Sequence, residues 1–333
     1  MRSFVIWLFS LLAATAFAQE LPPWRTATPA EQRLDAAAFQ GFDEGITTAL
    51  GDVQSVVVIL QGRKVYEYYR DGHPDTLRDA QSVTKSALTL LVGTALQRGQ
   101  LDSLDQPVVH LIPEWRSLNP DPRAQAITLS HLLAMTSGFE TNDSAGTAEP
   151  LAPAVAWSRP IRAEPGERFA YDNSGPALVQ SILERITGHR IADLVHAQLV
   201  VPLALREPRY VHHSAWMRTV DMAKLGCLLL QDGRWANQQV LPPGFVAQMV
   251  RPHSAGGPPV GLPYGLNWWA APGPTYIASG YGGQVIWVHP PLNLVIAVNS
   301  TVSQESWQRG QAMGLVRGRI FQAVQKRLGG KGR

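Results

Sequence analysis

Short apolar runs near the start and near the end of the sequence have the length and composition of β-strands. Val53–Leu60 and Lys64–Tyr69 are rich in β-branched and aromatic residues, and the Gln61-Gly62-Arg63 turn between them predicts a β-hairpin. Three further strands are predicted late in the chain, at Thr275–Ala278, Gln284–Val288 and Leu292–Val298.

Helix-like patterns occupy the remaining long apolar segments. The run Ser86–Leu101 is apolar nearly all round, which predicts a buried central helix. A helix opened by Pro176 and closed by Gly188 carries a single apolar stripe. Further helices are predicted over Glu31–Leu50 and Gln304–Arg327. The segment from Asp102 to about Val211 reads as helical and loop-rich, and Pro252–Pro263 reads as a loop. The fold class is therefore α/β with a helical middle.

The first residues have the pattern of a secretory signal peptide. Arg2 precedes an apolar run from Phe4 to Phe17, and Ala16-Phe17-Ala18 forms a small-x-small cleavage site. The run is shorter than the roughly 20 residues that a membrane span needs. We expect cleavage after Ala18, a mature chain from Gln19, export to the periplasm or medium, and no stable membrane span afterwards.

Composition narrows the classes of partner and cofactor. The formal net charge is +3 and no run of lysine or arginine occurs, so nucleic-acid binding gains no support. The sole cysteine, Cys227, lies in an apolar helical setting and is expected to be a buried core residue. No cluster has the spacing of zinc ligands, and the adjacent His212 and His213 favour an ordinary surface or core role. We expect no metal and no cofactor.

Ser82-Val83-Thr84-Lys85, at the start of the predicted central helix, is the strongest candidate for chemistry. Ser82 and Lys85 are one helical turn apart, so their side chains share a face and can meet. Burial and the positive end of the helix dipole disfavour an ammonium group there. The pattern favours a serine nucleophile with a lysine that accepts its proton. No Gly-x-Ser-x-Gly occurs, which argues against the nucleophile elbow of α/β-hydrolases.

A second candidate group is Tyr171-Asp172-Asn173, just ahead of the Pro176 helix. In an extended chain Tyr171 and Asn173 point the same way. A tyrosine near an amine can transfer a proton, and an asparagine can hold a substrate carbonyl. A turn with a capping asparagine would explain the tripeptide equally well.

Together these motifs resemble the serine β-lactamase and penicillin-binding-protein superfamily, in particular its class C β-lactamase, esterase and 6-aminohexanoate-dimer hydrolase branch. The resemblance runs from about Ala38 to Val298. Besides the two motifs, it rests on the segments Ile127–Phe139, Pro165–Gly175, Ala223–Gly233, Tyr264–Trp269 and Ser279–Gln284.

The resemblance implies an acyl-enzyme mechanism. Ser82 would attack a carbonyl, and Lys85 with Tyr171 would remove its proton and later protonate the leaving group. Asn173 would orient the substrate or Lys85. No cofactor is implied, and the partner is a small-molecule ester or amide.

The resemblance also implies an oxyanion site and a fold. The oxyanion would lie between the backbone N–H groups of Ser82 and Tyr281, the latter just after Ser279-Gly280. The implied fold is a β-lactamase/transpeptidase-like, mostly antiparallel sheet flanked by helices. The expected domain spans residues 19–333, with an α/β core over about 30–101 and 215–330 and an inserted helical lobe over about 102–214.

One departure from the family pattern bears on the substrate. Antibiotic-handling members carry lysine or histidine where this chain has Ala278, and such a cation would hold a substrate carboxylate. We therefore favour a small ester or amide over a β-lactam or a D-Ala-D-Ala terminus, unless another loop supplies a cation. Trp268 and Trp269 either wall the acyl pocket or belong to the core. A catalytically inactive peptide-binding module is the alternative outside enzymes.

Overall fold

A computed structural model of the chain describes residues 24–141, 147–301 and 309–329. The predicted signal peptide lies outside these ranges and stays a prediction. Among the described residues, no helix is both long and apolar enough to cross a bilayer.

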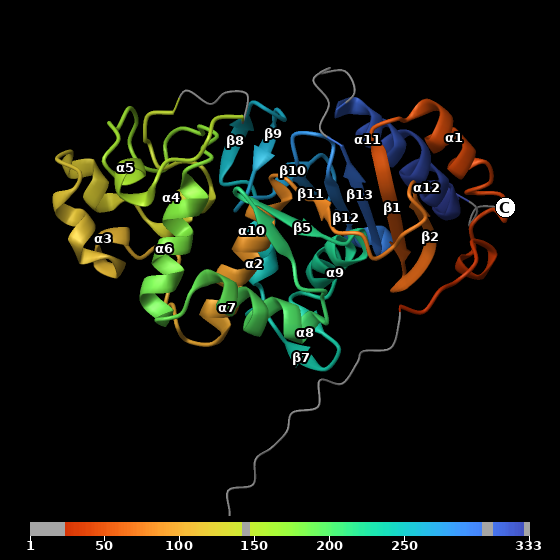
Figure 1. Cartoon of the computed structure of the whole chain (residues 1–333), viewed down its shortest axis with the longest axis horizontal. Coiled ribbons are helices and arrows are strands. Elements are labelled where there is room, and N and C mark those ends of the chain that lie inside the picture. Colours follow the sequence, from red (N-terminus) through yellow and green to blue (C-terminus); the bar gives the residue numbers. More distant parts are fainter. Residues whose placement is uncertain (1–23, 142–146, 302–308, 330–333) are drawn as a thin grey trace, which may run out of the picture.

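An eight-stranded antiparallel sheet forms the centre of the molecule (Figure 1). The spatial order is β2-β1-β13-β12-β11-β10-β9-β8, so the first hairpin lies beside the last strand of the chain. The strands of this sheet are β1 (Val53–Leu60), β2 (Arg63–Tyr69), β8 (Ser254–Gly257), β9 (Leu262–Tyr264), β10 (Trp269–Ala271), β11 (Thr275–Ser279), β12 (Val285–His289) and β13 (Leu294–Ser300).

Two smaller sheets and a set of helices complete the described part of the chain. The smaller sheets consist of β3 (Arg78–Asp79), β5 (Ser214–Met217) and β4 (Arg209–Val211), and of β6 (Arg234–Trp235) and β7 (Gln238–Gln239). The α-helices are α1 (Phe42–Ala49), α2 (Val83–Gln97), α3 (Val108–Leu111), α4 (Leu129–Leu133), α5 (Pro153–Trp157), α6 (Gly175–Thr187), α7 (Ile191–Val195), α8 (Val201–Leu203), α9 (Thr219–Leu230), α10 (Phe245–Val250), α11 (Arg309–Leu315) and α12 (Phe321–Gly329). Short 3-10 and π-helical turns are η1 (Ala30–Gln32), η2 (Pro113–Ser117), η3 (Pro122–Ala126), η4 (His196–Val200), η5 (Pro290–Leu292) and η7 (Val316–Ile320).

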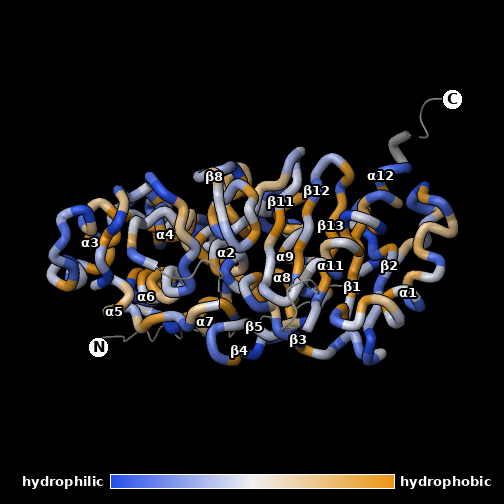
Figure 2. The backbone as a smooth tube through the Cα atoms, turned by 90° about the horizontal axis from the view of Figure 1, so that it is seen from above, coloured by the Kyte–Doolittle hydropathy of each residue, from blue (hydrophilic) through white to orange (hydrophobic). Residues whose placement is uncertain are grey.

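Both faces of the large sheet are covered, which explains why β1 is apolar almost throughout. Side chains alternate between the two faces of a strand. Val56 and Val58 therefore join the core cluster with α1, α11 and α12, whereas Val57 and Ile59 join the cluster with α2 and α9. Figure 2 shows this concentration of hydrophobic residues along the central strands.

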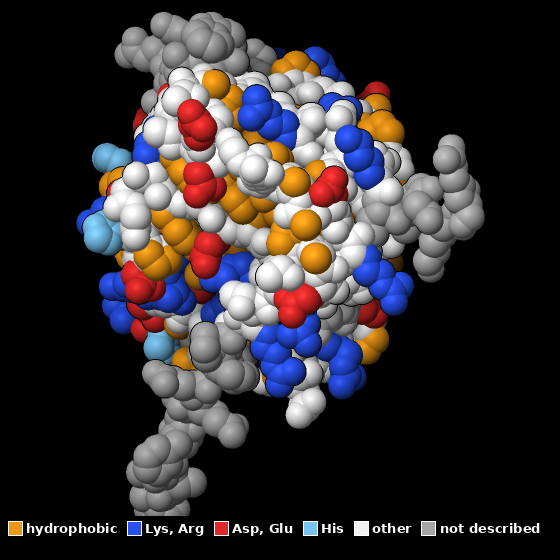
Figure 3. Space-filling view, turned by 90° about the vertical axis from the view of Figure 1, so that its right-hand side faces the viewer, with side chains coloured by type: hydrophobic (Ala, Val, Ile, Leu, Met, Phe, Trp, Pro, Cys, Tyr) orange, Lys and Arg blue, Asp and Glu red, His pale blue; other side chains and the backbone are white. Residues whose placement is uncertain are grey.

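The helical lobe, from α3 to α6, lies at the end of the molecule opposite α1 and α12 (Figure 1). Helix α2 runs between the lobe and the sheet and contacts both α6 and β11. The opposite end, seen in Figure 3, mixes acidic and basic side chains with apolar ones. The sequence-derived fold class, a β-lactamase-like α/β arrangement with a mostly antiparallel sheet, agrees with this architecture.

Several predicted elements are confirmed. The first hairpin and the three late strands lie where the apolar runs placed them, to within two residues at each end. Helix α6 has Pro176 in its first turn and ends at Gly188, whose φ of 70° is the left-handed conformation that favours glycine. Cys227 is buried in α9, and burial raises the pKa of its thiol.

Three predicted elements need correction. A single helix over Glu31–Leu50 is wrong, because the chain turns after η1 and α1 begins only after Gly41, which has a φ of 72°. Pro252–Pro263 is not simply a loop, since it contributes β8 and β9 to the sheet edge. The glycines allow this pairing, because a Cβ at Gly256 would lie 1.7 Å from the Leu262 carbonyl oxygen. The last helix is present as an unbroken helical run over 309–329, and the only correction is that it contains the π-helical turn η7; 302–308 lie outside the described residues.

Candidate active site

Ser82 stands at the turn between the short strand β3 and helix α2. It is the residue immediately before the helix, and Gln81 before it adopts a left-handed φ of 47°. A non-glycine residue held in this conformation stores backbone strain, which is common where a side chain must be presented for chemistry. The predicted helix is present but begins at Val83, three residues earlier than the apolar run suggested.

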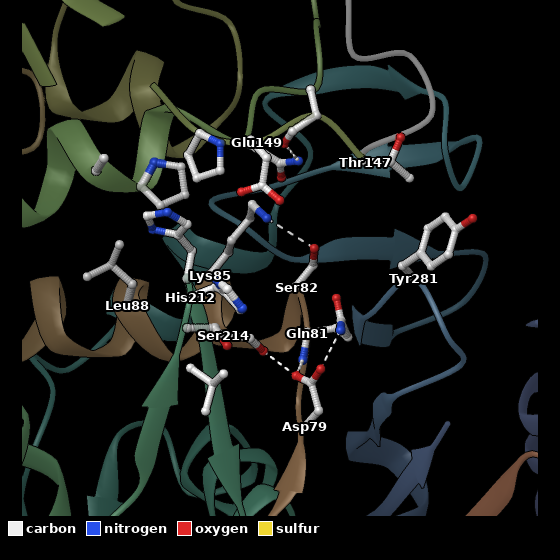
Figure 4. A pocket seen from close by; sticks show the side chains of 18 of the residues that line it. Asp79, Gln81, Ser82, Lys85, Leu88, Thr147, Glu149, His212, Ser214 and Tyr281 are labelled. Carbon is white, nitrogen blue, oxygen red and sulfur yellow. Dashed lines mark hydrogen bonds between the residues drawn. The ribbon is translucent and has the colours of Figure 1, made fainter. Parts of the chain in front are cut away.

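Lys85 points directly at Ser82. Its Nζ lies 3.0 Å from the Ser82 Oγ, and Figure 4 shows the amine directed at the hydroxyl. Most of α2 is buried, but Lys85 itself is half-buried and borders a pocket. The predicted meeting of hydroxyl and amine is therefore present, in a partly open setting.

Asp79 fixes the turn that presents Ser82, and the sequence analysis missed it. Its Oδ1 accepts a 2.9 Å hydrogen bond from the Gln81 backbone N–H, and its carboxylate also accepts from the Gln81 side chain and the Ser214 hydroxyl. The Asn299 side chain donates to the Asp79 carbonyl at 2.7 Å and so ties the turn to β13. An aspartate bonded to the backbone two residues on is a common turn device, which is the signal that could have identified it.

Strand β11 lies against the same turn through Gly280. A Cβ at this glycine would be 2.9 Å from the Gln81 Cβ and 2.5 Å from the Gln284 Oε1, so a larger residue would push the strand away. The Gly280 N–H donates to the Gln284 carbonyl of the neighbouring chain segment at 2.8 Å. Strand β10 pairs with β11 only up to Ile277, so the edge beyond it is not covered by β10. The end of β11, at Ser279, therefore has an edge that β10 leaves open. Gly280 and Tyr281 follow it, next to the turn that holds Ser82.

Tyr171 approaches Lys85 from the helical lobe. Its ring centroid is 5.2 Å from the Lys85 Nζ, and the ring stacks parallel to Trp269 at 6.4 Å. The side chain is buried, at 6% exposure. The structure thus brings together the three residues for which the sequence predicted proton transfer.

A buried ion pair holds the Tyr171-Asp172-Asn173 segment in place. The Arg159 guanidinium donates to both carboxylate oxygens of Asp172, at 3.2 and 2.6 Å. The Asp172 Oδ1 also accepts from the Ser174 N–H at the start of α6. Asn173 borders the pocket and donates its amide to the Ala148 carbonyl at 2.8 Å. Asp172 therefore anchors the segment between Tyr171, whose ring contacts the Lys85 amine, and Asn173, which lines the pocket.

A pocket of about 420 Å³ opens beside the Ser82–Lys85 pair. Elements of both the core and the lobe line it, including Ser82, Lys85, Glu149, Asn173, His212 and Tyr281. His212 and His213, for which the sequence favoured an ordinary role, form the tip of the β4–β5 hairpin and line this pocket. Neither sequence spacing nor apolar pattern could have placed them there, because the hairpin comes from a distant part of the chain.

Two tryptophans considered as pocket walls lie elsewhere. Trp268 is 1% exposed in the core cluster with α2, and Trp269 packs behind Tyr171 in the other cluster. Neither lines the pocket beside Ser82. The core interpretation is therefore the right one for both.

The charged side chains around the pocket bear on which substrates it can hold. Ala278 is fully buried on the face of β11 that packs against α2. Among the described residues that line the pocket, no arginine occurs and Lys85 is the only lysine. The carboxylates of Asp79 and Glu149 also line it. Within the described ranges, no group of three histidine, cysteine or acidic residues is arranged to hold a metal ion.

Comparison with known proteins places this geometry in a family. The model of the family described as Beta-lactamase matches residues 37–312. Esterase EstB from Burkholderia gladioli is 30% identical over 203 residues, which cover 54% of this chain and 51% of EstB. The match thus spans about half the length of that relative.

Solved structures share the fold at low sequence identity. A protein described as a 6-aminohexanoate-dimer hydrolase from Bacillus anthracis aligns with a TM-score of 0.71 and 19% identity, over 94% of this chain and 90% of its own. EstCE1, described as a hydrolase with promiscuous acyltransferase activity, aligns with a TM-score of 0.66 and 17% identity, over 89% of this chain and 99% of its own. The resemblance of the motifs, the sheet order and the family match agree: this chain belongs to the Beta-lactamase family.

Proposed function

We propose that this protein is a serine hydrolase that cleaves a small ester or amide through an acyl-enzyme on Ser82. The observation that carries the proposal is the 3.0 Å contact between the Lys85 Nζ and the Ser82 Oγ at the edge of a pocket. This is hydrogen-bond distance, which a nucleophile and its base require. The name of the relative Esterase EstB supports ester hydrolysis.

The proposed reaction has two halves. The Ser82 Oγ bonds to the carbonyl carbon while its proton passes to the Lys85 amine. The tetrahedral intermediate then expels the alcohol or amine, which takes a proton from Lys85 or Tyr171, and an ester on Ser82 remains. Water attacks that ester, gives up a proton to the same pair of residues, and releases the acid with Ser82 restored.

Tyr171 is the second proton carrier in this scheme. Its ring lies 5.2 Å from the Lys85 amine, so the two groups can share one proton path. Because Trp269 stacks on the ring and Arg159 fixes the next residue, the phenol is held rather than free to rotate away. A positioned acid or base contributes about a hundredfold to ten-thousandfold in rate.

The oxyanion is proposed to lie between β11 and the start of α2. In an antiparallel strand successive N–H groups alternate in direction. Since the Gly280 N–H donates toward the β12 side, alternation directs the Ser279 N–H to the side where β11 is not covered by β10. Tyr281 lies in the turn just after the strand and lines the pocket beside Ser82, so its N–H is proposed as the donor from this segment. The Ser82 N–H would supply the second donor. Such donors each lower the barrier by about 3 kcal/mol.

The charges around the pocket favour a neutral substrate. A substrate carboxylate would meet the carboxylates of Asp79 and Glu149, and the small buried Ala278 offers it no cation. This disfavours a β-lactam or D-Ala-D-Ala substrate and favours an uncharged ester or amide.

Steady-state hydrolysis of p-nitrophenyl acetate tests the proposal. The wild type is compared with Ser82→Ala and with Ser158→Ala, a control at an exposed serine at the end of α5. We expect wild-type and Ser158→Ala rates to agree and Ser82→Ala to lose at least about a thousandfold in kcat. Equal rates in all three proteins would refute the role of Ser82.

A further inference from the structure

We propose that a second cavity, adjoining the catalytic pocket, binds an unbranched alkyl chain of the substrate. This inference rests on the proposed function, because it takes the scissile bond to lie beside Ser82. The chain belongs to either the acyl or the alcohol part of a neutral ester. The substrate class is thus a medium-chain ester rather than a small polar one.

The second cavity has a volume of about 290 Å³ and adjoins the catalytic pocket. Helices α2 and α7, the turn η4 and strand β5 contribute to its walls. The residues that line both spaces are Thr84, Leu88, Gln180, His212 and His213. These five side chains form the boundary that an alkyl chain of a ligand bound at Ser82 would pass to reach the second cavity.

The lining of the second cavity is chiefly apolar. It includes Ala87, Leu91, Ile191, Val195, Leu199 and Met217. Two of its polar groups have partners: the Thr84 Oγ1 accepts from the Ala215 N–H at 2.9 Å, and Arg206 donates to the Asp75 carbonyl at 3.1 Å. Gln180 and both histidines lie at the boundary with the catalytic pocket, so an alkyl chain that passes this boundary would gain from leaving water against the apolar lining.

Helix α2 runs from the nucleophile along the catalytic pocket to the second cavity. Lys85, Leu88 and Leu91 follow at intervals of three residues, so each lies about 4.5 Å further along the helix from Ser82. In Figure 4, Leu88 lies on the side of the Ser82–Lys85 pair away from Tyr281. An alkyl chain would therefore pass Lys85 and Leu88 and run beside Leu91, while the carbonyl stays near Tyr281.

The junction between the two spaces is built by a strained turn. His212, at the tip of the β4–β5 hairpin, has a φ of 51°, and the flanking Val211 and Ser214 are paired across the hairpin. Such a conformation costs about 1 kcal/mol or more in a non-glycine residue. This backbone conformation places both histidines at the boundary between the two cavities. Their rings can border an alkyl chain that enters from the catalytic pocket.

Two ester series identify the source of the chain. One series lengthens the acyl part, from p-nitrophenyl acetate through butyrate to octanoate. The other lengthens the alcohol part, from methyl acetate to octyl acetate. We expect kcat/KM to rise by up to about fourfold per methylene in one series. No rise in either series would overturn the inference.

Filling the second cavity with a larger side chain should abolish the preference for long alkyl chains. Val195→Phe adds bulk within the cavity, and Val201→Phe makes the same change at an exposed position, 55% accessible, outside it. We expect Val195→Phe to lose the octyl advantage by at least about tenfold while acetate turnover stays near wild type. Val201→Phe should retain both. An unchanged chain-length profile in Val195→Phe would count against the cavity.

Direct binding separates this inference from the proposed function. Calorimetry with the neutral probes 1-octanol and ethanol on Ser82→Ala needs no turnover. Octanol binding at least about tenfold tighter than ethanol, and lost in Val195→Phe, would support the cavity even if no ester is hydrolysed. If esters are hydrolysed through Ser82 but octanol binds no better than ethanol, the proposed function stands and the cavity proposal fails.

Discussion

The two walls of the catalytic pocket are built in different ways. The first wall consists of the Ser82–Lys85 turn of α2 and the end of β11, and it is locked into the sheet through Asp79, Gly280 and Asn299. The second wall consists of the lobe residues around Asn173 and the β4–β5 hairpin tip, and it is anchored by one buried ion pair and one tight turn.

The first wall holds the groups proposed to carry out the reaction, whereas the second wall is expected to influence which substrates fit. The first wall holds its groups to a geometry in which a shift of about 1 Å can cost a hundredfold in rate. The second wall borders both cavities and can vary in shape while the nucleophile stays in place. We therefore expect changes in the first wall to reduce kcat severely. Changes in the second wall should alter stability and chain-length preference more than the chemical step.

Lys85→Arg should have the largest effect, because an arginine cannot accept a proton near neutral pH. We expect kcat for p-nitrophenyl acetate to fall by at least about a thousandfold while the protein remains folded by circular dichroism. Lys224→Arg, a change on α9 outside the catalytic pocket, is the matched control. Turnover near wild type in Lys85→Arg would remove the lysine from the mechanism.

Gly280→Val should have the next largest effect. The added Cβ and methyl groups would meet Gln81 and Gln284 and separate β11 from the nucleophile turn. We expect kcat to fall by about a hundredfold with a smaller change in KM. Gly51→Val provides a comparison at an exposed glycine of the turn between α1 and β1, where the backbone is not left-handed and an added Cβ would meet no atom within 4 Å. Wild-type kcat in Gly280→Val would show that the close approach is not needed.

Arg159→Met tests the anchor of the second wall. It leaves the Asp172 carboxylate, 8% exposed, without its bidentate partner. We expect urea denaturation to show a loss of about 3 kcal/mol in the free energy of unfolding. Arg162→Met, which breaks an exposed pair with Glu140, should cost less than about 1 kcal/mol. Equal losses in both variants would contradict the anchoring role of Arg159.

Substitution of His131, in the lobe, should have a smaller and pH-dependent effect on the stability of the protein. Burial lowers the pKa of His131, and its Nδ1 accepts a hydrogen bond from the Thr128 N–H, which requires the neutral ring. Below about pH 6.5 the unfolded chain takes up a proton that the folded protein resists, so stability falls as pH decreases. Wild type should therefore lose more stability than His131→Asn between about pH 7.5 and pH 5.5. Parallel losses would show that His131 does not contribute.

Local patterns predicted the nucleophile turn of the first wall and the Tyr171 segment of the lobe. The spacing of Ser82 and Lys85 places both on one helical face, and the motif around Tyr171 places a phenol ahead of α6. The first hairpin and the late strands could be predicted because β-branched runs bounded by turn residues are typical of strands. These features depend on residues close together in the chain.

The rest depends on contacts between distant segments. Asp79 and Ser214 are 135 residues apart, and Gln284 meets Gly280 only because β11 and β12 pair. The helix expected over Glu31–Leu50 was wrong because Gly41 and the packing of Phe39 on Tyr66 override a helical pattern. The hairpin that brings His212 to the pocket carries no apolar signal of that placement.

Intact-mass spectrometry of the acyl-enzyme shows whether Ser82 is the residue that is acylated. The protein is mixed with p-nitrophenyl butyrate, quenched in acid within the first turnovers, and digested to locate the modified residue. We expect a butyryl adduct on Ser82 that disappears as water hydrolyses it, and no such adduct in Ser82→Ala. Rapid ester turnover with no adduct on Ser82, or with a transient adduct on another residue, would contradict the role of Ser82.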